Sequence, residues 1–170
     1  MFVVISNVIN SGNVDFDVFL DLKFHDIPNT VAKAVKVAAD LGVWMLNVHI
    51  SGGSTMMESA RDAILSHGGC KPILIGVTVL TSISSAELSE IGINNDLKDQ
   101  VVQLAKLAYQ SGLDGVVCSA EEAKLLRNSM PADFILVTPG IRREQDAAGD
   151  QKRVITPSQA IRNGSDYLVV

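Results

Sequence analysis

Two residues at the end of an apolar run, Asp21 and Lys23, have the types and the spacing for proton-transfer chemistry. The run over 16–24 predicts a strand, and alternate residues of a strand face the same side. We therefore expect the carboxylate and the ammonium to point together, each favouring the charged form of the other. A third charge, Asp26, follows just past the strand end. Such an array suits the stabilisation of a developing carbanion and its protonation.

The same spacing is compatible with a structural ion pair, so both interpretations stay open at this point. Burying an ion pair is costly unless its hydrogen bonds are well satisfied. A position at the carboxyl end of a barrel strand favours function. Leu22 and Phe24 alternate with the two charged residues, and we expect them to face the helical layer.

The rest of the chain alternates short apolar runs with longer amphipathic segments. After the first strand, strands are predicted at 43–49, 73–80, 115–118, 134–138 and 167–170. Helices are predicted at 28–41, 54–66, 84–91, 96–110, 120–128 and 157–162. Unbroken runs of Val, Ile and Leu are typical of parallel strands that are covered on both faces. We find no hairpin signal between them.

Repeated βα units form either an open doubly wound sheet or a closed barrel. Polar residues recur at the carboxyl end of nearly every predicted strand: Asp21, Lys23, His49, Thr81, Ser119 and Arg142. In a barrel, the loops at this end carry the functional residues. No glycine-rich dinucleotide or phosphate loop follows the first strand. We therefore expect an α/β fold, a (β/α)8 barrel. Because only about six of the eight strands are found, residues 1–170 are predicted to be a single partial barrel domain.

Composition excludes several classes of partner. The net charge of −5 and the absence of a basic cluster argue against nucleic acid and against anionic membrane surfaces. The apolar N-terminus lacks a basic flank and is too short to span a membrane, which favours a cytoplasmic location. Cys70 and Cys118 have no metal-ligand spacing and suggest a reducing compartment, with Cys118 packed in the core. Three scattered histidines predict no metal site.

The segment DLKFHDIPNT at 21–30 closely resembles the signature of the orotidine 5′-phosphate decarboxylase family. The resemblance continues through LGVWMLNVHISGG (41–53), VTVLTS (77–82), GLDGVVCSA (112–120), VTPGIR (137–142) and AGDQKRVITPSQAI (148–161). Its bacterial form fits best. The resemblance implies a barrel enzyme that converts orotidine monophosphate to uridine monophosphate and CO2 in de novo pyrimidine biosynthesis. It also implies a homodimer with shared active sites and neither a metal nor an organic cofactor.

The resemblance assigns catalytic roles to the charged residues of the motif. Lys23 matches the proton donor to the carbon that loses CO2. Asp21 matches the aspartate beside the substrate carboxylate, which favours its departure. Asp26 matches an aspartate that crosses a dimer interface into the partner's site.

Substrate-binding roles follow from the same resemblance. Ile27 and Thr30 match positions that also reach across the dimer, with Thr30 near the ribose hydroxyls. Thr81 matches a substrate contact in the loop after its strand. Arg142 and Gln151 match residues at the phosphate end, and arginine suits phosphate through forked, charge-assisted hydrogen bonds.

The chain departs from the family pattern at both ends. The family's first-strand aspartate and second-strand lysine would precede Met1, and its terminal Gly-Arg pair would follow Val170. We therefore expect an incomplete barrel, and whether the chain is active without these residues stays open at this point. Two alternatives stay open: a related Mg²⁺-dependent sugar-phosphate decarboxylase or aldolase that shares the D-x-K-x-x-D strand motif, and a non-catalytic fragment.

Overall fold

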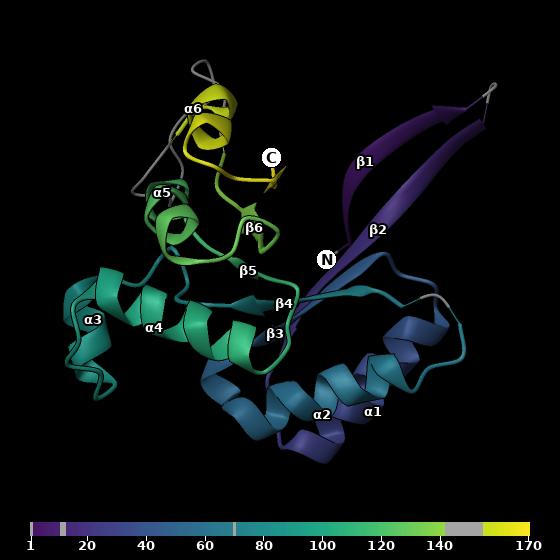
Figure 1. The fold of residues 1–170 in the computed structure, drawn as a ribbon, viewed down its shortest axis with the longest axis horizontal. Helices are drawn as coiled ribbons and strands as arrows, with labels where there is room; N and C mark the ends of the chain where they lie inside the picture. The colour runs from purple at the N-terminus through teal and green to yellow at the C-terminus, as the bar shows by residue number, and fades with distance from the viewer. Residues whose placement is uncertain (1, 11–12, 70, 142–154) are drawn as a thin grey trace.

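The computed structural model describes residues 2–10, 13–69, 71–141 and 155–170. These residues form one sheet whose strands lie side by side in chain order (Figure 1). The strands are β1 (Phe2–Asn10), β2 (Asn13–Phe24), β3 (Met45–His49), β4 (Ile73–Val77), β5 (Gly115–Val117), β6 (Ile135–Thr138) and β7 (Tyr167–Leu168). The helices are α1 (Pro28–Asp40), α2 (Ser54–Leu65), α3 (Ser85–Glu90), α4 (Leu97–Gln110), α5 (Ala120–Ser129) and α6 (Pro157–Arg162), with a 3-10 turn at Ile50–Gly52.

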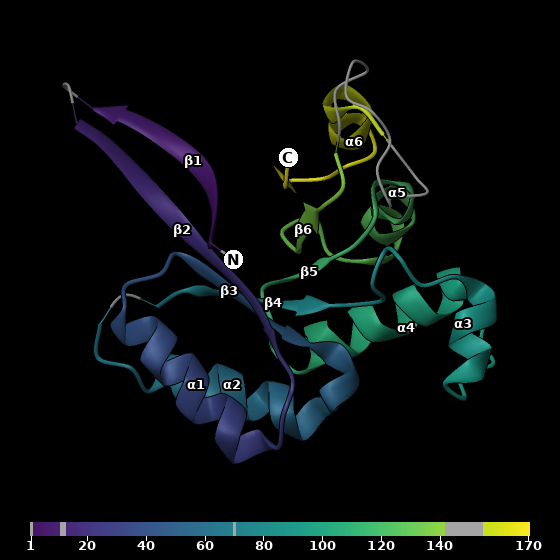
Figure 2. The same ribbon diagram turned by 180° about the vertical axis from the view of Figure 1, so that it is seen from behind.

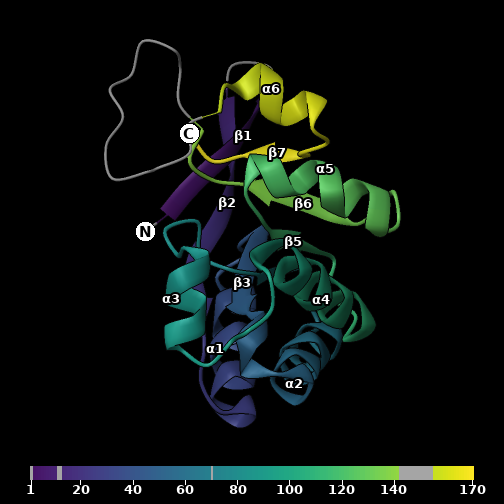
Figure 3. The same cartoon turned by 90° about the vertical axis from the view of Figure 1, so that its left-hand side faces the viewer.

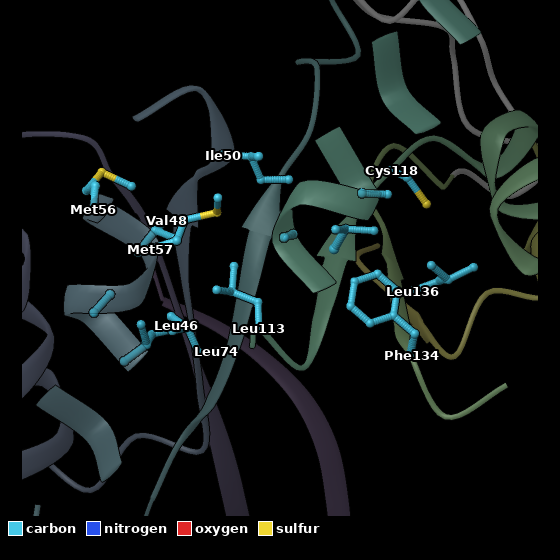
Figure 4. Close-up of a cluster of buried hydrophobic side chains, with 14 of the residues drawn as sticks. Leu46, Val48, Ile50, Met56, Met57, Leu74, Leu113, Cys118, Phe134 and Leu136 are labelled. Atoms are coloured by element: carbon cyan, nitrogen blue, oxygen red, sulfur yellow. The ribbon is translucent and has the colours of Figure 1, made fainter. Parts of the chain in front are cut away.

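Within the described residues, β2 to β7 form six parallel strands, as the βα pattern predicted. The main helices follow one another around one side of this sheet (Figures 1 and 3). The main core lies between the sheet and these helices; Figure 4 labels its members Leu46, Val48, Ile50, Met56, Met57, Leu74, Leu113, Cys118, Phe134 and Leu136. A smaller cluster, Phe19, Met45, Ile75 and Val137, covers the opposite face. Both faces are therefore apolar, which explains why the strands do not alternate in polarity.

The sheet curls strongly towards its inner face. Trp44, just before β3, meets Tyr167 of β7 edge to face, with ring centroids 5.0 Å apart. Four strand spacings of about 4.8 Å would separate β3 from β7 in a flat sheet. The contact therefore requires a curved sheet, and the six parallel strands form part of a barrel.

The first strand was missed by the sequence pattern. β1 pairs antiparallel with β2, from Phe2 opposite Leu20 to Asn10 opposite Asn13. Figures 1 and 2 show this hairpin projecting beyond the helices. The prediction of no hairpin was wrong. Only two residues, a serine and a glycine, separate the strands, and a short glycine-containing connection is a recognised hairpin signal.

At two places, an aspartate just before a strand adds a hydrogen bond to the neighbouring strand. Asp114 precedes β5, and its Oδ2 accepts a hydrogen bond from the backbone N–H of Leu74 in β4 at 2.7 Å. Asp166 precedes β7, and its Oδ2 accepts one from Leu136 in β6 at 2.7 Å. The backbone N–H of each aspartate also donates to the carbonyl of the same leucine. Each carboxylate thus extends the pairing of two neighbouring strands by one further bond.

Candidate active site

Strand β2 contains a bulge as it approaches the carboxyl end of the sheet. Leu20 pairs with Leu46 of β3, whereas the next pair joins Phe24 to Val48. Three residues of β2 therefore stand opposite the single residue Asn47. Bulges interrupt the ladder of backbone hydrogen bonds and redirect side chains, and they are common beside active sites.

The bulge contains Lys23, whose φ of 51° is the only positive value for a non-glycine among the described residues. A left-handed conformation costs an L-residue roughly 1–2 kcal/mol. The backbone N–H of Lys23 donates to Asn47 Oδ1 at 2.7 Å, in place of a ladder bond. The surroundings thus hold Lys23 in a conformation that it would not adopt alone, as is often found at functional sites.

The bulge brings the two residues of the predicted pair into direct contact. Lys23 Nζ lies 2.6 Å from Asp21 Oδ1 and 2.7 Å from Oδ2. Asp21 Oδ1 also accepts a hydrogen bond from Asn47 Nδ2 at 2.6 Å. The side chain of Lys23 remains 36% exposed and that of Asp21 17% exposed. The pair is therefore anchored on its inner side and open to solvent, and so to a ligand, on the other.

The alternation of side chains in a regular strand predicts only part of the arrangement in β2. Phe24 packs against the helical core as expected. Leu22, which was expected there too, is 50% exposed, so this prediction was wrong. Because Leu22 lies inside the bulge, its side chain no longer follows the two-residue alternation of the strand.

Two histidines border the pair. His25 follows β2 and His49 ends β3, with ring centroids 5.2 Å apart. Burial lowers the pKa of His49, electrostatic interactions with His25 and Lys23 lower it further, and Asp21 opposes the shift. His49 is therefore a neutral imidazole at pH 7, and it presents hydrogen-bonding groups without adding charge.

The three motif residues after β2 lie at the surface of the single chain. Asp26 Oδ1 accepts a hydrogen bond from the backbone N–H of Ile27 at 2.6 Å. Asp26 and Thr30 are exposed, and Ile27 is 67% exposed at the start of α1. Their side chains are accessible to a second molecule.

Of the three remaining predicted residues, the structure describes one. Thr81 is exposed in the loop between β4 and α3. Arg142 and Gln151 lie outside the described residues. Sequence reasoning missed Asn47, although a polar residue in the middle of the apolar run LNVH was a visible signal.

Neither a metal site nor a membrane span is found in the part of the chain that the structure describes. No cluster of three or more His, Cys, Asp or Glu side chains there is arranged to hold a metal ion. None of the helices there combines the length and the apolar composition that crossing a membrane requires.

Comparison with known proteins places these features in one family. The model of the orotidine 5′-phosphate decarboxylase / HUMPS family matches residues 5–170. Proteins named orotidine 5′-phosphate decarboxylase are 62% identical over 156 residues in Psychromonas ingrahamii and 60% over 155 in Vibrio cholerae. The first alignment covers 92% of this chain and the second 91%, and each covers 67% of the relative.

Solved structures agree with the fold. The orotidine 5′-phosphate decarboxylase of Lactobacillus acidophilus superposes with a TM-score of 0.78 at 44% identity, covering 89% of this chain and 65% of that chain. An uncharacterised conserved protein from Geobacillus kaustophilus gives 0.76 at 41%, with the same coverage. The chain therefore spans about two thirds of the length of the proteins that it matches.

Proposed function

Because the chain belongs to the orotidine 5′-phosphate decarboxylase / HUMPS family, we propose that it carries the decarboxylation centre of an orotidine 5′-phosphate decarboxylase. The reaction converts orotidine monophosphate to uridine monophosphate and CO2 in pyrimidine biosynthesis. The observation that carries this proposal is the Asp21–Lys23 pair, held by a bulge at the carboxyl end of a barrel strand and open on one side.

The pair can act through charge placement alone. With the substrate carboxylate beside Asp21, like charges repel, and this repulsion is relieved as CO2 leaves. The bond to CO2 breaks, and its electron pair stays on the pyrimidine carbon. Lys23 Nζ stabilises this carbanion and then gives it a proton. Solvent returns a proton to the lysine, so no redox step is needed.

The substrate-binding residues follow from the family motifs. We assign the ribose hydroxyls to Thr30, a further substrate contact to Thr81, and the phosphate to Arg142 and Gln151. The exposure of Thr81 is compatible with this role, because a ligand contact has to be reachable from solvent.

A homodimer with shared sites is the second part of the proposal. Three exposed apolar residues lie on α1 and at its two ends, and we call them the α1 stripe: the N-cap Ile27 (67%), Val37 (60%) and the C-cap Leu41 (71%), which lies four positions after Val37. An exposed apolar stripe at helical spacing is typical of a surface that packs against a partner. It begins beside Asp26, and the family motif assigns Asp26 and Ile27 to the partner's site.

We also assign the protein to the cytoplasm. Cys118 is a free, buried thiol, which suits a reducing compartment. The net charge of −5 and the absence of a basic cluster argue against nucleic acid and anionic membranes as partners.

The test is a decarboxylation assay with orotidine monophosphate, with and without a chelator. The chain is assayed alone and also as a chimera, in which its residues 17–52 replace the matching segment of the Vibrio cholerae relative. Chelator-resistant turnover by the chimera, lost on Lys23→Ala, supports the proposal. Turnover that requires Mg²⁺ would instead favour a sugar-phosphate decarboxylase or aldolase. An inactive chimera of native fold would reject the assignment.

A further inference from the structure

Asn47 is a fully buried amide in the middle of β3, with 0% of its surface exposed. A buried polar group is costly unless its hydrogen bonds are satisfied. Asn47 Oδ1 accepts from the backbone N–H of Lys23 at 2.7 Å, and Nδ2 donates to Asp21 Oδ1 at 2.6 Å. These partners determine the amide orientation, because only the oxygen can accept from an N–H and only the nitrogen can donate to a carboxylate.

The amide also lies where the strand pairing fails. Opposite the bulge, Asn47 has no paired residue on β2. Its side-chain oxygen accepts the hydrogen bond from the backbone N–H of Lys23 in place of a backbone carbonyl. The side chain of Asn47 therefore holds both the left-handed backbone of Lys23 and the carboxylate of Asp21, which faces the Lys23 ammonium.

We propose that Asn47 is the positioning residue of the site, which sets the geometry of the Asp21–Lys23 pair through its two amide bonds. The inference rests on the proposed function for its effect on turnover, but its structural content stands on the contacts alone. Because Asn47 is fully buried beneath the pair, it acts on the reacting groups rather than on the substrate. Its loss should lower kcat and leave KM nearly unchanged.

Two variants separate the two bonds. Asn47→Leu has a similar volume and removes both bonds. Asn47→Asp keeps an acceptor for the N–H of Lys23, removes the donor to Asp21 and adds a second carboxylate beside it. Asn163→Leu is the matched control, because Asn163 Nδ2 donates to the carbonyl of Ala120 at 2.8 Å, far from the pair.

The first measurement is amide hydrogen exchange and the carboxyl ¹³C spectrum by NMR, on the 170-residue chain. We expect the Lys23 amide to exchange about tenfold faster in Asn47→Leu, the change that follows from losing one hydrogen bond. In Asn47→Asp this amide should stay protected, while the Asp21 carboxyl resonance shifts. Neither signal should change in Asn163→Leu.

The second measurement is turnover, in a form of the protein that decarboxylates orotidine monophosphate. Both Asn47 variants should lose about 10- to 100-fold in kcat, with KM within about threefold of wild type. Wild-type kcat in both variants would overturn the inference and leave the proposed function intact. The expected NMR changes in the chain, together with an inactive chimera of native fold, would uphold the positioning role and count against the function.

An unchanged Lys23 amide in a folded Asn47→Leu variant would also overturn the inference. If Asn47→Leu does not fold, the Asp21 resonance in Asn47→Asp decides the matter. A wild-type signal there means that Asn47 does not hold the carboxylate.

Discussion

Lys23 Nζ lies 2.6 Å from Asp21 Oδ1, although the two residues belong to one strand and only one position separates them. In a regular strand, residues two apart on the same face stand about 6.6 Å apart along the strand axis. The positive φ of Lys23 and the bulge shorten the reach between the side chains. The ammonium is thus fixed beside the carboxylate instead of sampling solvent, as a positioned proton donor requires.

Removal of the ammonium should abolish proton delivery. In a form of the protein that decarboxylates orotidine monophosphate, Lys23→Met keeps most of the side-chain volume, and we expect kcat to fall by about 10²–10⁴-fold, the usual contribution of a positioned acid. Lys106→Met on the exposed face of α4 is the control and should keep wild-type turnover. Comparable loss in both variants, measured by steady-state kinetics with orotidine monophosphate, would contradict the assignment.

His49 should make stability fall as the solution becomes acidic. Its pKa is lowered in the folded protein by burial and by the neighbouring His25 and Lys23, with Asp21 opposing. The unfolded chain therefore takes up this proton at a higher pH, so the contribution of His49 is present above pH 6.5 and is lost as pH falls through the folded pKa. His49→Gln removes this term. Thermal melts between pH 7 and pH 5 should show a larger drop in Tm for wild type than for the variant; parallel curves would refute the prediction.

Asp114 and Asp166, whose carboxylates each accept a hydrogen bond from a neighbouring strand, should respond differently to substitution by asparagine. Burial raises the pKa of Asp114, and the hydrogen bond from Leu74 opposes this shift only in part. Asp114 therefore contributes to the stability of the folded protein below pH 3.8, the ordinary pKa of its carboxyl group. This contribution is lost as pH rises through the pKa in the folded protein. Asp114→Asn keeps an acceptor oxygen without the charge, so at pH 7 it should match or exceed wild type in free energy of unfolding.

Asp166→Asn should instead destabilise the protein at pH 7. Asp166 accepts from Arg127 Nη2 at 2.7 Å as well as from the backbone of Leu136. Because the ion pair is partly exposed, its loss should lower the free energy of unfolding by only about 0.5–1 kcal/mol. Urea titrations of both aspartate variants check the order; a larger loss for Asp114→Asn would contradict it.

Cys118 should be unreactive in the folded protein. It is 1% exposed, and burial strongly raises the pKa of its thiol, with the charge of Glu122 adding to the shift. In a Cys70→Ser background, a thiol reagent at pH 8 should label the native protein far more slowly than the urea-unfolded chain. Equal rates before and after unfolding would show that the thiol is accessible.

The α1 stripe should determine the oligomeric state. Val37→Glu with Leu41→Glu places two like charges on this exposed face and should convert a dimer to a monomer in light scattering. Ile161→Glu on α6 is the control, because Ile161 is also an exposed apolar residue (53%) but lies outside the stripe. A dimer that survives the double change would place the interface elsewhere.

The sequence by itself determined the strands and helices of the βα units, the family and the Asp21–Lys23 pairing. Apolar periodicity and motif spacing are local properties, and each is readable without knowing what packs against it. The prediction that Cys118 packs in the core belongs to the same class, because it rests on an apolar run.

Only the tertiary structure decided how the pair is held. The bonds from Asn47 to Asp21 and Lys23 join residues 26 and 24 positions apart, and no local pattern reports such contacts. The exposure of Leu22 is decided in the same way. Strand register depends on which strand lies alongside, so a bulge becomes visible only when β3 is in place beside β2.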